Sequence, residues 1–467
     1  MKRSIIPVMA LAVALGSCGG GKTSPKDVSK SAHFTRAKNE VKLMTLDPGH
    51  FHAALVQKNM YDQVSPDVFV YAPQGNDLKE HLKRIDGYNS RAENPTVWNE
   101  KIYTETDYLE KMLSEKPGNV VIISGNNRIK TDYIKKSVEA GLNVLADKPM
   151  VITAEKFPVL EEAFKVAREK GVLLYDIMTE RFSVTTVLQR ELSMLPEIFG
   201  KLDSGTVEKP AVEKISVHFF YKNVSGKALI RPAWFFDVEQ QGEGIVDVNT
   251  HLVDLVQWVC FPEQIVQKSD IQMIAAKRWP TVLSKDEFKE VTLLDQFPDY
   301  LTSTVADGKL NVFANGEIVY KINGAVAKVK AIWNYKAPEG CGDTHYSIIR
   351  GSVSSLEIRQ GVEEKYDPTL YVIAKDGVDL KTFASNLDKD VKALPQAGLT
   401  LESVNANTWK IVVPEILKVG HEAHFAQVMG KYLEYLKAGK LPEWEVPNMI
   451  TKYYTTTWGL KLAKENK

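Results

Sequence analysis

The sequence is poor in cysteine, and it lacks both a long apolar run and an excess of charge of either sign. Three cysteines occur in 467 residues, and none stands in a CxxC pair or a Cys/His cluster, so a zinc site is not expected. No apolar run approaches the roughly 20 residues of a membrane-spanning helix. Lysine and arginine total 59, as do aspartate and glutamate. This balance excludes a generally basic nucleic-acid binder, because affinity for phosphates needs a basic face.

The composition is that of an ordinary folded protein. Hydrophobic residues make up 44% and charged residues 25% of the chain, and these values exclude disordered, collagenous and disulfide-framework proteins. A chain of this length is expected to form about two or three domains. It can bury a sizeable core without help from disulfides or metals.

The N-terminus has the pattern of a secretory signal. A basic start, Met1-Lys2-Arg3, precedes an apolar stretch from Ile5 to Leu15 that is too short to span a membrane. The ending Leu15-Gly16-Ser17-Cys18 resembles a bacterial lipobox. We therefore predict a signal peptide at residues 1–17, lipid attachment at Cys18 and a flexible tether at 18–39. The expected location is the bacterial cell envelope, periplasmic or surface-facing; an ordinary cleaved signal that contains a cysteine is the alternative.

Lipidation of Cys18 would leave two cysteines, Cys260 and Cys341. They could pair in an oxidising compartment, but the sequence does not give their separation, so the question stays open.

Residues 40–176 alternate between short apolar runs and longer amphipathic stretches. The expected strands are 41–46, 68–71, 119–123, 143–146 and 172–175, and the expected helices are 51–59, 78–85, 131–140 and 154–170. Strands alternating with helices predict an α/β fold with a doubly wound parallel sheet.

Residues 177–467 have a different pattern. Three alternating apolar–polar runs between Lys309 and Trp333 are separated by Asn315-Gly316 and Asn323-Gly324, and each Asn-Gly pair predicts a hairpin. Further strands are expected at 215–221 and 352–360, and helices at 421–438 and 447–463. This half is therefore expected to be an α+β domain on an antiparallel sheet.

In a doubly wound sheet, ligands bind beyond the carboxyl ends of the strands. The loop after the first strand spans residues 47–52. Of the three glycines of the dinucleotide fingerprint G-x-G-x-x-G it keeps only Gly49, with Asp47 and His52 at the outer positions. A plain strand–turn–helix connection is the alternative interpretation of this loop. The loop after the 119–123 strand brings Ser124, Asn126 and Asn127 to the same edge.

Two histidines at positions i and i+2, His50 and His52, stand in the first loop beside Asp47. This pattern suggests a metal, but one face of a helix would not hold both imidazoles, so no metal is predicted. We expect them to line the nucleotide or substrate pocket, with simple packing as the alternative.

Two motifs resemble those of the glucose–fructose oxidoreductase, inositol dehydrogenase and MocA (Gfo/Idh/MocA) family. Residues 141–149, GLNVLADKP, resemble the family segment aGkhVlxEKP, with aspartate in place of glutamate. Residues 242–254, GEGIVDVNTHLVD, resemble GGGxxxDxxxHxxD, with Glu243 interrupting the glycines. The resemblance covers most of residues 40–360 and extends to a lipoprotein-type subgroup that carries the LDPGHFH loop. It implies a Rossmann domain, and a second domain whose open sheet often mediates homo-oligomerisation.

The resemblance also implies roles for individual residues. Lys148 matches the lysine that contacts the reacting hydroxyl, and Asp247 and His251 match the acid and the proton-transferring histidine. At positions i and i+4 of a helix the last two would share one face. A loop lysine and a capping acid beside a partly buried histidine are the structural alternatives. The implied cofactor is NAD, with NADP open, and the predicted cofactor contacts are Asp47, Gly49, His50, His52, Ser124, Asn126, Asn127 and Lys148.

The implied substrate is a small sugar, polyol or glycoside, predicted to contact Arg231, Trp234 and His251. A tryptophan just before the second motif could stack on a sugar ring, with core packing as the alternative. His345 is a further candidate at the site. Because free NAD is not expected outside the cytoplasm, the cofactor should be held tightly.

Three functions follow in order of preference. The first is NAD(P)-dependent oxidation or reduction of a sugar, polyol or glycoside hydroxyl. The second is glycoside cleavage through oxidation, elimination and re-reduction. The third is a catalytically inactive carbohydrate- or nucleotide-binding surface lipoprotein, which the eroded glycine loop would favour.

Overall fold

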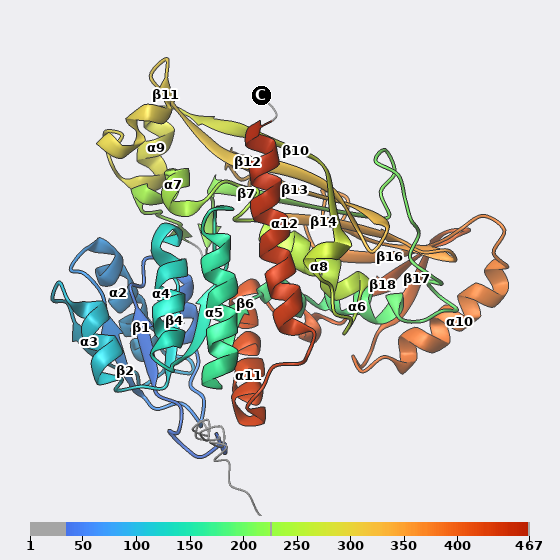
Figure 1. The fold of residues 1–467 in the computed structure, drawn as a ribbon. Helices are drawn as coiled ribbons and strands as arrows, with labels where there is room; N and C mark the ends of the chain where they lie inside the picture. The colour runs from blue at the N-terminus through green and yellow to red at the C-terminus, as the bar shows by residue number, and fades with distance from the viewer. Residues whose placement is uncertain (1–33, 225–226, 466–467) are drawn as a thin grey trace, which may run out of the picture.

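The computed structural model describes residues 34–224 and 227–465 (Figure 1). The predicted signal peptide, Cys18 and most of the predicted tether lie outside these residues. Within the described ranges, no helix combines the length and the apolar character needed to cross a membrane.

The first domain is built on a six-stranded parallel sheet with the order β3-β2-β1-β4-β5-β6. This is the doubly wound order, so the predicted Rossmann fold is confirmed. The strands are β1 (Leu43–Leu46), β2 (Asp67–Tyr71), β3 (Asn99–Tyr103), β4 (Val120–Ile123), β5 (Asn143–Asp147) and β6 (Leu174–Ile177). The helices are α1 (His52–Val56), α2 (Asn76–Ser90), α3 (Tyr108–Glu115), α4 (Asn127–Glu139) and α5 (Phe157–Lys170).

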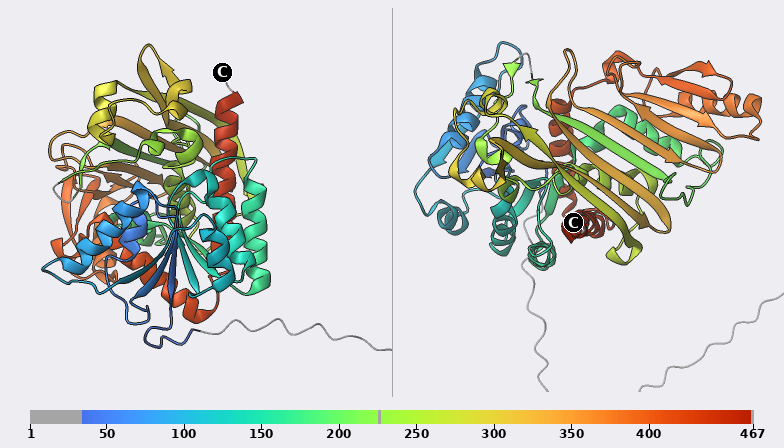
Figure 2. Two further views of the ribbon diagram at one scale, coloured as in Figure 1. Left: turned by 90° about the vertical axis from the view of Figure 1, so that its left-hand side faces the viewer. Right: turned by 90° about the horizontal axis from the view of Figure 1, so that it is seen from above.

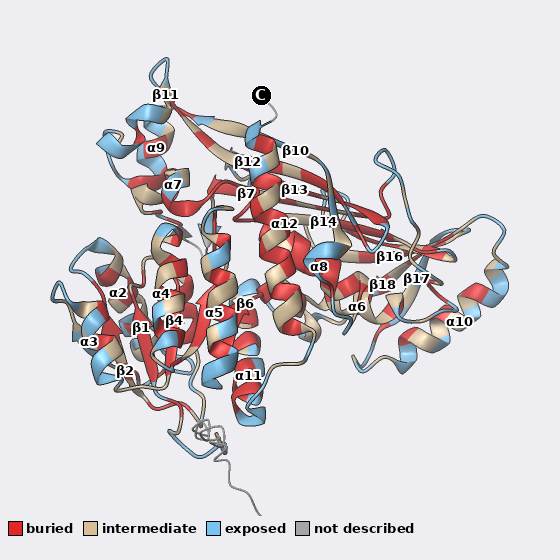
Figure 3. Ribbon diagram, in the orientation of Figure 1, coloured by how far each residue is buried: buried red, intermediate tan, exposed pale blue. Residues whose placement is uncertain are grey.

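The apolar runs explain why these strands lie in the middle of the domain. Every residue of β1, β4 and β6 is buried, as expected for strands covered on both faces (Figure 3). Helices α4 and α5 lie side by side on one face of the sheet (Figure 1). Helix α4 begins where the Asn126 side chain accepts a hydrogen bond from the Arg128 amide, and α5 ends at Gly171, whose φ of 68° suits glycine.

The second domain lies over the carboxyl ends of these strands and contains a ten-stranded mixed sheet (Figure 2). Its path is β10-β12-β13-β7-β14-β15-β16-β18-β17, with β11 paired to β12. All pairs in this path are antiparallel except β13 with β7. The strands are β7 (Val212–Tyr221), β10 (Ile271–Leu283), β11 (Val305–Ala306), β12 (Lys309–Ile322), β13 (Ala325–Lys336), β14 (Thr344–Arg350), β15 (Ser354–Arg359), β16 (Thr369–Ala374), β17 (Thr400–Asn405) and β18 (Thr408–Val412).

The helices of the second domain are α6 (Val184–Ser193), α7 (Val238–Gln241), α8 (Asn249–Cys260), α9 (Lys285–Thr292), α10 (Leu380–Ala393), α11 (His421–Ala438) and α12 (Glu445–Glu465). Short 3-10 turns precede α6 and α7, at η1 (Thr179–Phe182) and η2 (Ala233–Phe236). Helix α12 runs alongside both domains (Figure 1), in contact with α5 of the first and α8 and β10 of the second. Buried residues of α11 and α12, among them Phe425, Tyr432 and Tyr453, share one core with the first domain.

The hairpin predicted at Asn315-Gly316 is wrong, because β12 runs through both residues. Asn315 is buried, and its side chain donates to the Trp279 carbonyl and accepts from the Trp333 amide, so it ties the strand to both neighbours. A Cβ on Gly316 would lie 2.2 Å from Ile245. Gly316 therefore lets the loop before α8 approach the sheet. The second predicted hairpin is confirmed, because the turn between β12 and β13 lies at Asn323-Gly324.

Candidate functional site

A buried ion pair joins the two domains at the carboxyl edge of the parallel sheet. Lys148 directly follows β5, and Asp247 lies in the turn before α8; Lys148 Nζ donates to Asp247 Oδ1 at 2.6 Å. Burial raises the pKa of Asp247, but the Lys148 charge and its hydrogen bond outweigh this and lower the pKa overall. The two residues that the motifs single out, 99 positions apart in the chain, therefore form one ionised pair.

His251 lies in the first turn of α8, four residues after Asp247. Burial and the nearby Lys148 charge lower the pKa of His251 to about 3, so the imidazole is neutral near pH 7. Its Nδ1 atom is buried and has no hydrogen-bond partner among the described residues. A neutral imidazole beside a lysine cation can accept a proton from a hydroxyl group.

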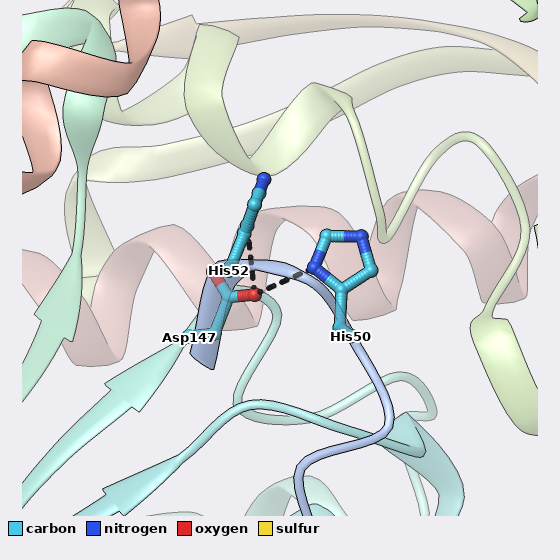
Figure 4. Close-up of side chains that lie close together, drawn as sticks. All are labelled: His50, His52 and Asp147. Atoms are coloured by element: carbon cyan, nitrogen blue, oxygen red, sulfur yellow. Dashed lines mark hydrogen bonds and ion pairs between the residues drawn. The ribbon is translucent and has the colours of Figure 1, made fainter. Parts of the chain in front are cut away.

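Asp147 gathers a second cluster on the other side of Lys148. Its Oδ2 atom lies 2.9 Å from His52 Nδ1 and 3.4 Å from His50 Nδ1, and it accepts a 2.9 Å hydrogen bond from Ser124 Oγ (Figure 4). Burial lowers the pKa of both His50 and His52. Burial raises the pKa of Asp147, but the contacts with the two imidazoles and the charge of Lys130 outweigh this and hold the pKa well below its usual range. The cluster is thus a carboxylate with two neutral imidazoles.

The orientation of the two rings follows from these contacts. Each Nδ1 faces the carboxylate, so the second ring nitrogen of each imidazole points away from Asp147 (Figure 4). His50 lies before α1 and His52 is its first residue, so the two imidazoles approach one carboxylate without sharing a face of a helix. One ligand atom of each of the three residues lies within 4.8 Å of the others. Of the two histidine contacts to Asp147, only that of His52 has hydrogen-bond geometry; His50 Nδ1 has no hydrogen-bond partner among the described residues, and the absence of a metal stays a prediction.

The loop that replaces the glycine-rich fingerprint is closely covered. A Cβ on Gly49 would lie 3.0 Å from Asp77 Oδ2 and 3.3 Å from the Trp234 ring. Trp234 Nε1 donates to Asp77 Oδ2 at 2.9 Å, which fixes the indole over the loop. Burial raises the pKa of Asp47 to about 6, although a hydrogen bond from Tyr133 opposes the rise.

Asn126 and Asn127 reach across to α7. Asn126 Nδ2 donates to Gln240 Oε1 at 2.7 Å, and Asn127 Nδ2 donates to the Gln241 carbonyl at 2.7 Å. These bonds connect the first turn of α4 to the second domain. Their predicted contact with a cofactor stays a prediction.

Arg231 is directed into the second domain. Its Nε and Nη2 atoms each donate at 3.0 Å to the carbonyls of Phe220 and Phe219, and its guanidinium lies over the Phe235 ring. These contacts anchor the segment that carries Trp234. The structure thus brings Trp234 to the first loop. The hydrogen bonds of Arg231 go instead to backbone carbonyls of β7.

A third polar cluster completes the surroundings of His251, and sequence reasoning missed most of it. Glu180 of η1 lies 3.6 Å from His421 and 3.9 Å from His345. Burial raises the pKa of this carboxyl, but the neighbouring histidines lower it to about 2. His345 shares Ser216 Oγ with His218, and His218 pairs with Asp343 at 2.9 Å. His345 was a candidate from the sequence, whereas no local motif marked Glu180 or His421.

The frame that holds these groups is a buried ionic network. Lys452 of α12 lies 2.6 Å from Asp176 of β6 and 2.9 Å from Asp254 of α8. Arg181 makes two bonds of 2.7 Å to Asp254 and one of 2.8 Å to Glu445. Because Arg181 follows Glu180 and Asp254 lies three residues after His251, this network fixes the site across both domains. The two cysteines among the described residues, Cys260 and Cys341, take no part in this network and are both free.

Comparison with known proteins agrees with this architecture. Residues 188–464 match the family model described as "Putative oxidoreductase C terminal domain", and residues 74–176 match "Oxidoreductase family, NAD-binding Rossmann fold". A crystal structure of a "putative oxidoreductase" from Parabacteroides merdae is 56% identical, covers 93% of this chain and 100% of its own, and gives a TM-score of 0.90. No curated protein matches this chain.

More distant solved structures show the same fold. Levoglucosan dehydrogenase, solved with NADH and levoglucosan, is 12% identical with a TM-score of 0.56, over 91% of this chain and 98% of its own. KijD10, a 3-ketoreductase from Actinomadura kijaniata solved with NADP, is 12% identical with a TM-score of 0.52, over 89% of this chain and 95% of its own. At this level of identity the likeness concerns the fold alone.

Proposed function

Because the chain belongs to the Gfo/Idh/MocA oxidoreductase family, we propose that it oxidises or reduces a hydroxyl-bearing carbon of a sugar, polyol or glycoside with a tightly held nicotinamide cofactor. The N-terminal domain is an NAD-binding Rossmann domain. The observation that carries the proposal is the assembly of Lys148, Asp247 and His251 from both domains at the carboxyl edge of that sheet.

The residues present fit the reactive end of a nicotinamide cofactor. A lysine, its carboxylate partner and a neutral histidine with an unpartnered Nδ1 lie where a doubly wound sheet binds its ligand. The phosphate end differs from the usual pattern, because Asp77 and Trp234 cover the single glycine of the loop. Such a covered loop suits a cofactor that is retained between turnovers. We propose that this cofactor is NAD, with NADP as the alternative.

The bound cofactor would supply the hydride acceptor, and the protein supplies orientation and proton transfer. Lys148 donates hydrogen bonds to the substrate hydroxyl and stabilises the negative charge that develops on its oxygen. His251, neutral at working pH, accepts the hydroxyl proton. Asp247 holds the Lys148 ammonium in place, and Asp147 with its two histidines fixes the backbone just before that lysine.

The substrate class is supported by the chemistry of the pocket. Histidine, carboxylate and lysine side chains from the two domains face one another there, and such groups bind hydroxyl-rich ligands through hydrogen bonds. Two structural neighbours, levoglucosan dehydrogenase and KijD10, carry names of enzymes that act on carbohydrate or keto groups. With the signal and lipobox-like ending, the same proposal places the enzyme at the cell envelope, anchored at Cys18.

One observation favours a second candidate, glycoside cleavage through oxidation, elimination and re-reduction. That route needs a base that removes a proton from the carbon next to the new ketone. The His50–Asp147–His52 cluster provides neutral imidazoles in addition to His251. Released aglycone, rather than an accumulating ketone, would distinguish this route.

The test uses the purified protein with its cofactor and a panel of sugars and glycosides. We expect Lys148→Ala and His251→Ala to abolish the sugar-dependent change in nicotinamide absorbance. Lys156→Ala removes a lysine from an exposed ion pair with Asp132 in the same domain and serves as the control, with unchanged activity. Full activity in both site variants would contradict the assigned roles.

A further inference from the structure

One strand of the second domain, β7, carries a row of three polar side chains at every second position. Lys214, Ser216 and His218 alternate along β7, and residues two apart on a strand share one face. Ser216 contacts both His218 and His345, and His218 is one of the groups that lower the pKa of Asp247. The His218 end of this row therefore belongs to the candidate active site, and Lys214 lies about 13 Å farther along the strand.

Lys214 is a buried cation without an acidic partner. It is 1% exposed, and its Nζ donates to Ser347 Oγ at 2.7 Å and to Gln189 Oε1 at 3.1 Å. Among the described residues no carboxylate forms an ion pair with it. The titratable group that interacts electrostatically with Lys214 is the Cys260 thiol. Burial raises the pKa of this thiol to about 12, so the thiol carries no charge near pH 7.

An unpaired ammonium in a protein interior is costly, and lysine is almost never fully buried without a partner. Burial lowers the pKa of Lys214 to about 8, so most of the population still carries the charge near pH 7. An ordinary core position would hold an apolar residue here. Because no described carboxylate compensates the Lys214 charge, we infer that an anion from outside the chain does so.

A cavity lies against Lys214. Its volume is about 40 Å³, enough for a carboxylate group in place of a few water molecules. Five hydroxyl-bearing residues line the wall, namely Ser183, Thr185, Thr186, Tyr346 and Ser347. Tyr346 donates to Glu357 and Ser347 donates to Gln189, which leaves Ser183, Thr185 and Thr186 as the candidate donors. Hydroxyl groups around a single ammonium provide the donors that a carboxylate accepts.

The cavity shares lining residues with the polar cluster near His251. Leu252 and Leu255, which line it, belong to the helix whose first turn carries His251, and His345 and Glu180 line it as well. Glu180 is the one carboxylate among the lining residues. Its oxygens lie 3.9 Å from His345 and 3.6 Å from His421.

We propose that the cavity at Lys214 binds a carboxylate group of the substrate, which makes the substrate an acidic sugar or a glycoside that carries a uronic or aldonic acid. This inference rests on the proposed function for the position of the reacting hydroxyl. The carboxylate accepts a hydrogen bond from Lys214 Nζ and from the surrounding hydroxyls, while the reacting hydroxyl lies at Lys148 and His251.

The experiment compares two disaccharide ligands that differ only in the carboxylate, the methyl glycoside of a glucuronosyl-glucose (the glucuronide) and that of a glucosyl-glucose (the glucoside), because a single sugar ring is too short to reach both Lys148 and Lys214. Binding is measured by titration calorimetry on the full protein. The wild type should bind the glucuronide at least about tenfold more tightly, equivalent to about 1.4 kcal/mol. Lys214→Met should remove this preference and leave the affinity for the glucoside unchanged. Lys330→Met, on β13 of the same sheet, is the control and should keep the preference.

Three results would overturn the proposal. The first is equal affinity of the wild type for the two ligands, which decides the matter even if Lys214→Met fails to fold. The second is a preference that survives in a folded Lys214→Met variant. The third is binding of acetate as tight as that of the glucuronide, which would mark a site for small anions. Because binding is measured without turnover, a confirmed preference without nicotinamide reduction would refute only the oxidoreductase proposal.

Discussion

The ion pair between Lys148 and Asp247 contributes to folding stability, and Lys148 is also proposed to act in catalysis. Single and double variants of the pair separate these two roles. The two side chains are 11% and 7% exposed and 2.6 Å apart, so the pair is buried and tight. Lys148→Met removes the charge and keeps a chain of similar length, which leaves the Asp247 carboxylate buried without a counter-charge. Breaking such a pair costs about 3–5 kcal/mol of folding free energy. We therefore expect the single variant to lose about 3 kcal/mol of stability.

The double variant Lys148→Met/Asp247→Asn should regain most of this loss, because no uncompensated charge remains in the interior. Its activity should stay at least about 100-fold below wild type, because the cation that stabilises the developing alkoxide is still missing. Urea unfolding followed by circular dichroism gives the stabilities, and the rate of sugar-dependent nicotinamide reduction gives the activities.

Two outcomes would refute this reasoning. A loss below about 1 kcal/mol in Lys148→Met would mean that the pair is solvated, as in an exposed ion pair. Recovery of activity together with stability in the double variant would mean that Lys148 acts only as a structural partner of Asp247.

Three further predictions follow from other parts of the molecule. His81 is buried on α2, and neither of its ring nitrogens has a hydrogen-bond partner among the described residues. Burial lowers its pKa from 6.5 to about 4, so stability is lost as the pH falls from 6.5 toward 4. His81→Leu should remove about 2 kcal/mol of the urea-measured loss between about pH 8 and about pH 5, and an unchanged pH profile would contradict a neutral buried imidazole. Lys452→Met leaves two buried carboxylates without their shared cation and should cost about 3–5 kcal/mol; a stability equal to that of wild type would show that the network is not closed to water. Gly244→Ala places a Cβ 1.8 Å from the Ala314 carbonyl oxygen and should lower the urea midpoint markedly, while unchanged stability would show that this loop shifts freely.

The sequence predicts the first domain well, because its signals are local. Runs such as residues 119–123 are buried at nearly every position and read as strands without reference to the rest of the chain. The strand β3 was missed because it lies at the edge of the sheet, and its residues Asn99–Tyr103 are mostly polar and exposed. An edge strand needs no apolar run, so no periodic pattern marks it.

The remainder of the site depends on contacts between distant segments. Asn315-Gly316 has the pattern of a turn, yet Ile245 packs on Gly316 and holds the strand straight, and sequence does not reveal that contact. Arg181 and Lys452 likewise have the character of surface residues in the sequence, and only the folded chain shows them sharing buried carboxylates. Motifs in single loops identified Lys148, Asp247 and His251, while the surrounding frame required the structure.

Direct analysis of bound nucleotide tests whether this protein carries a nicotinamide cofactor. Purified protein is denatured, and the released small molecules are identified by mass spectrometry, before and after incubation with NAD and NADP. We expect NAD(H) or NADP(H) to be released in an amount close to one per chain. Release of neither, with no uptake on incubation, would contradict the oxidoreductase proposal.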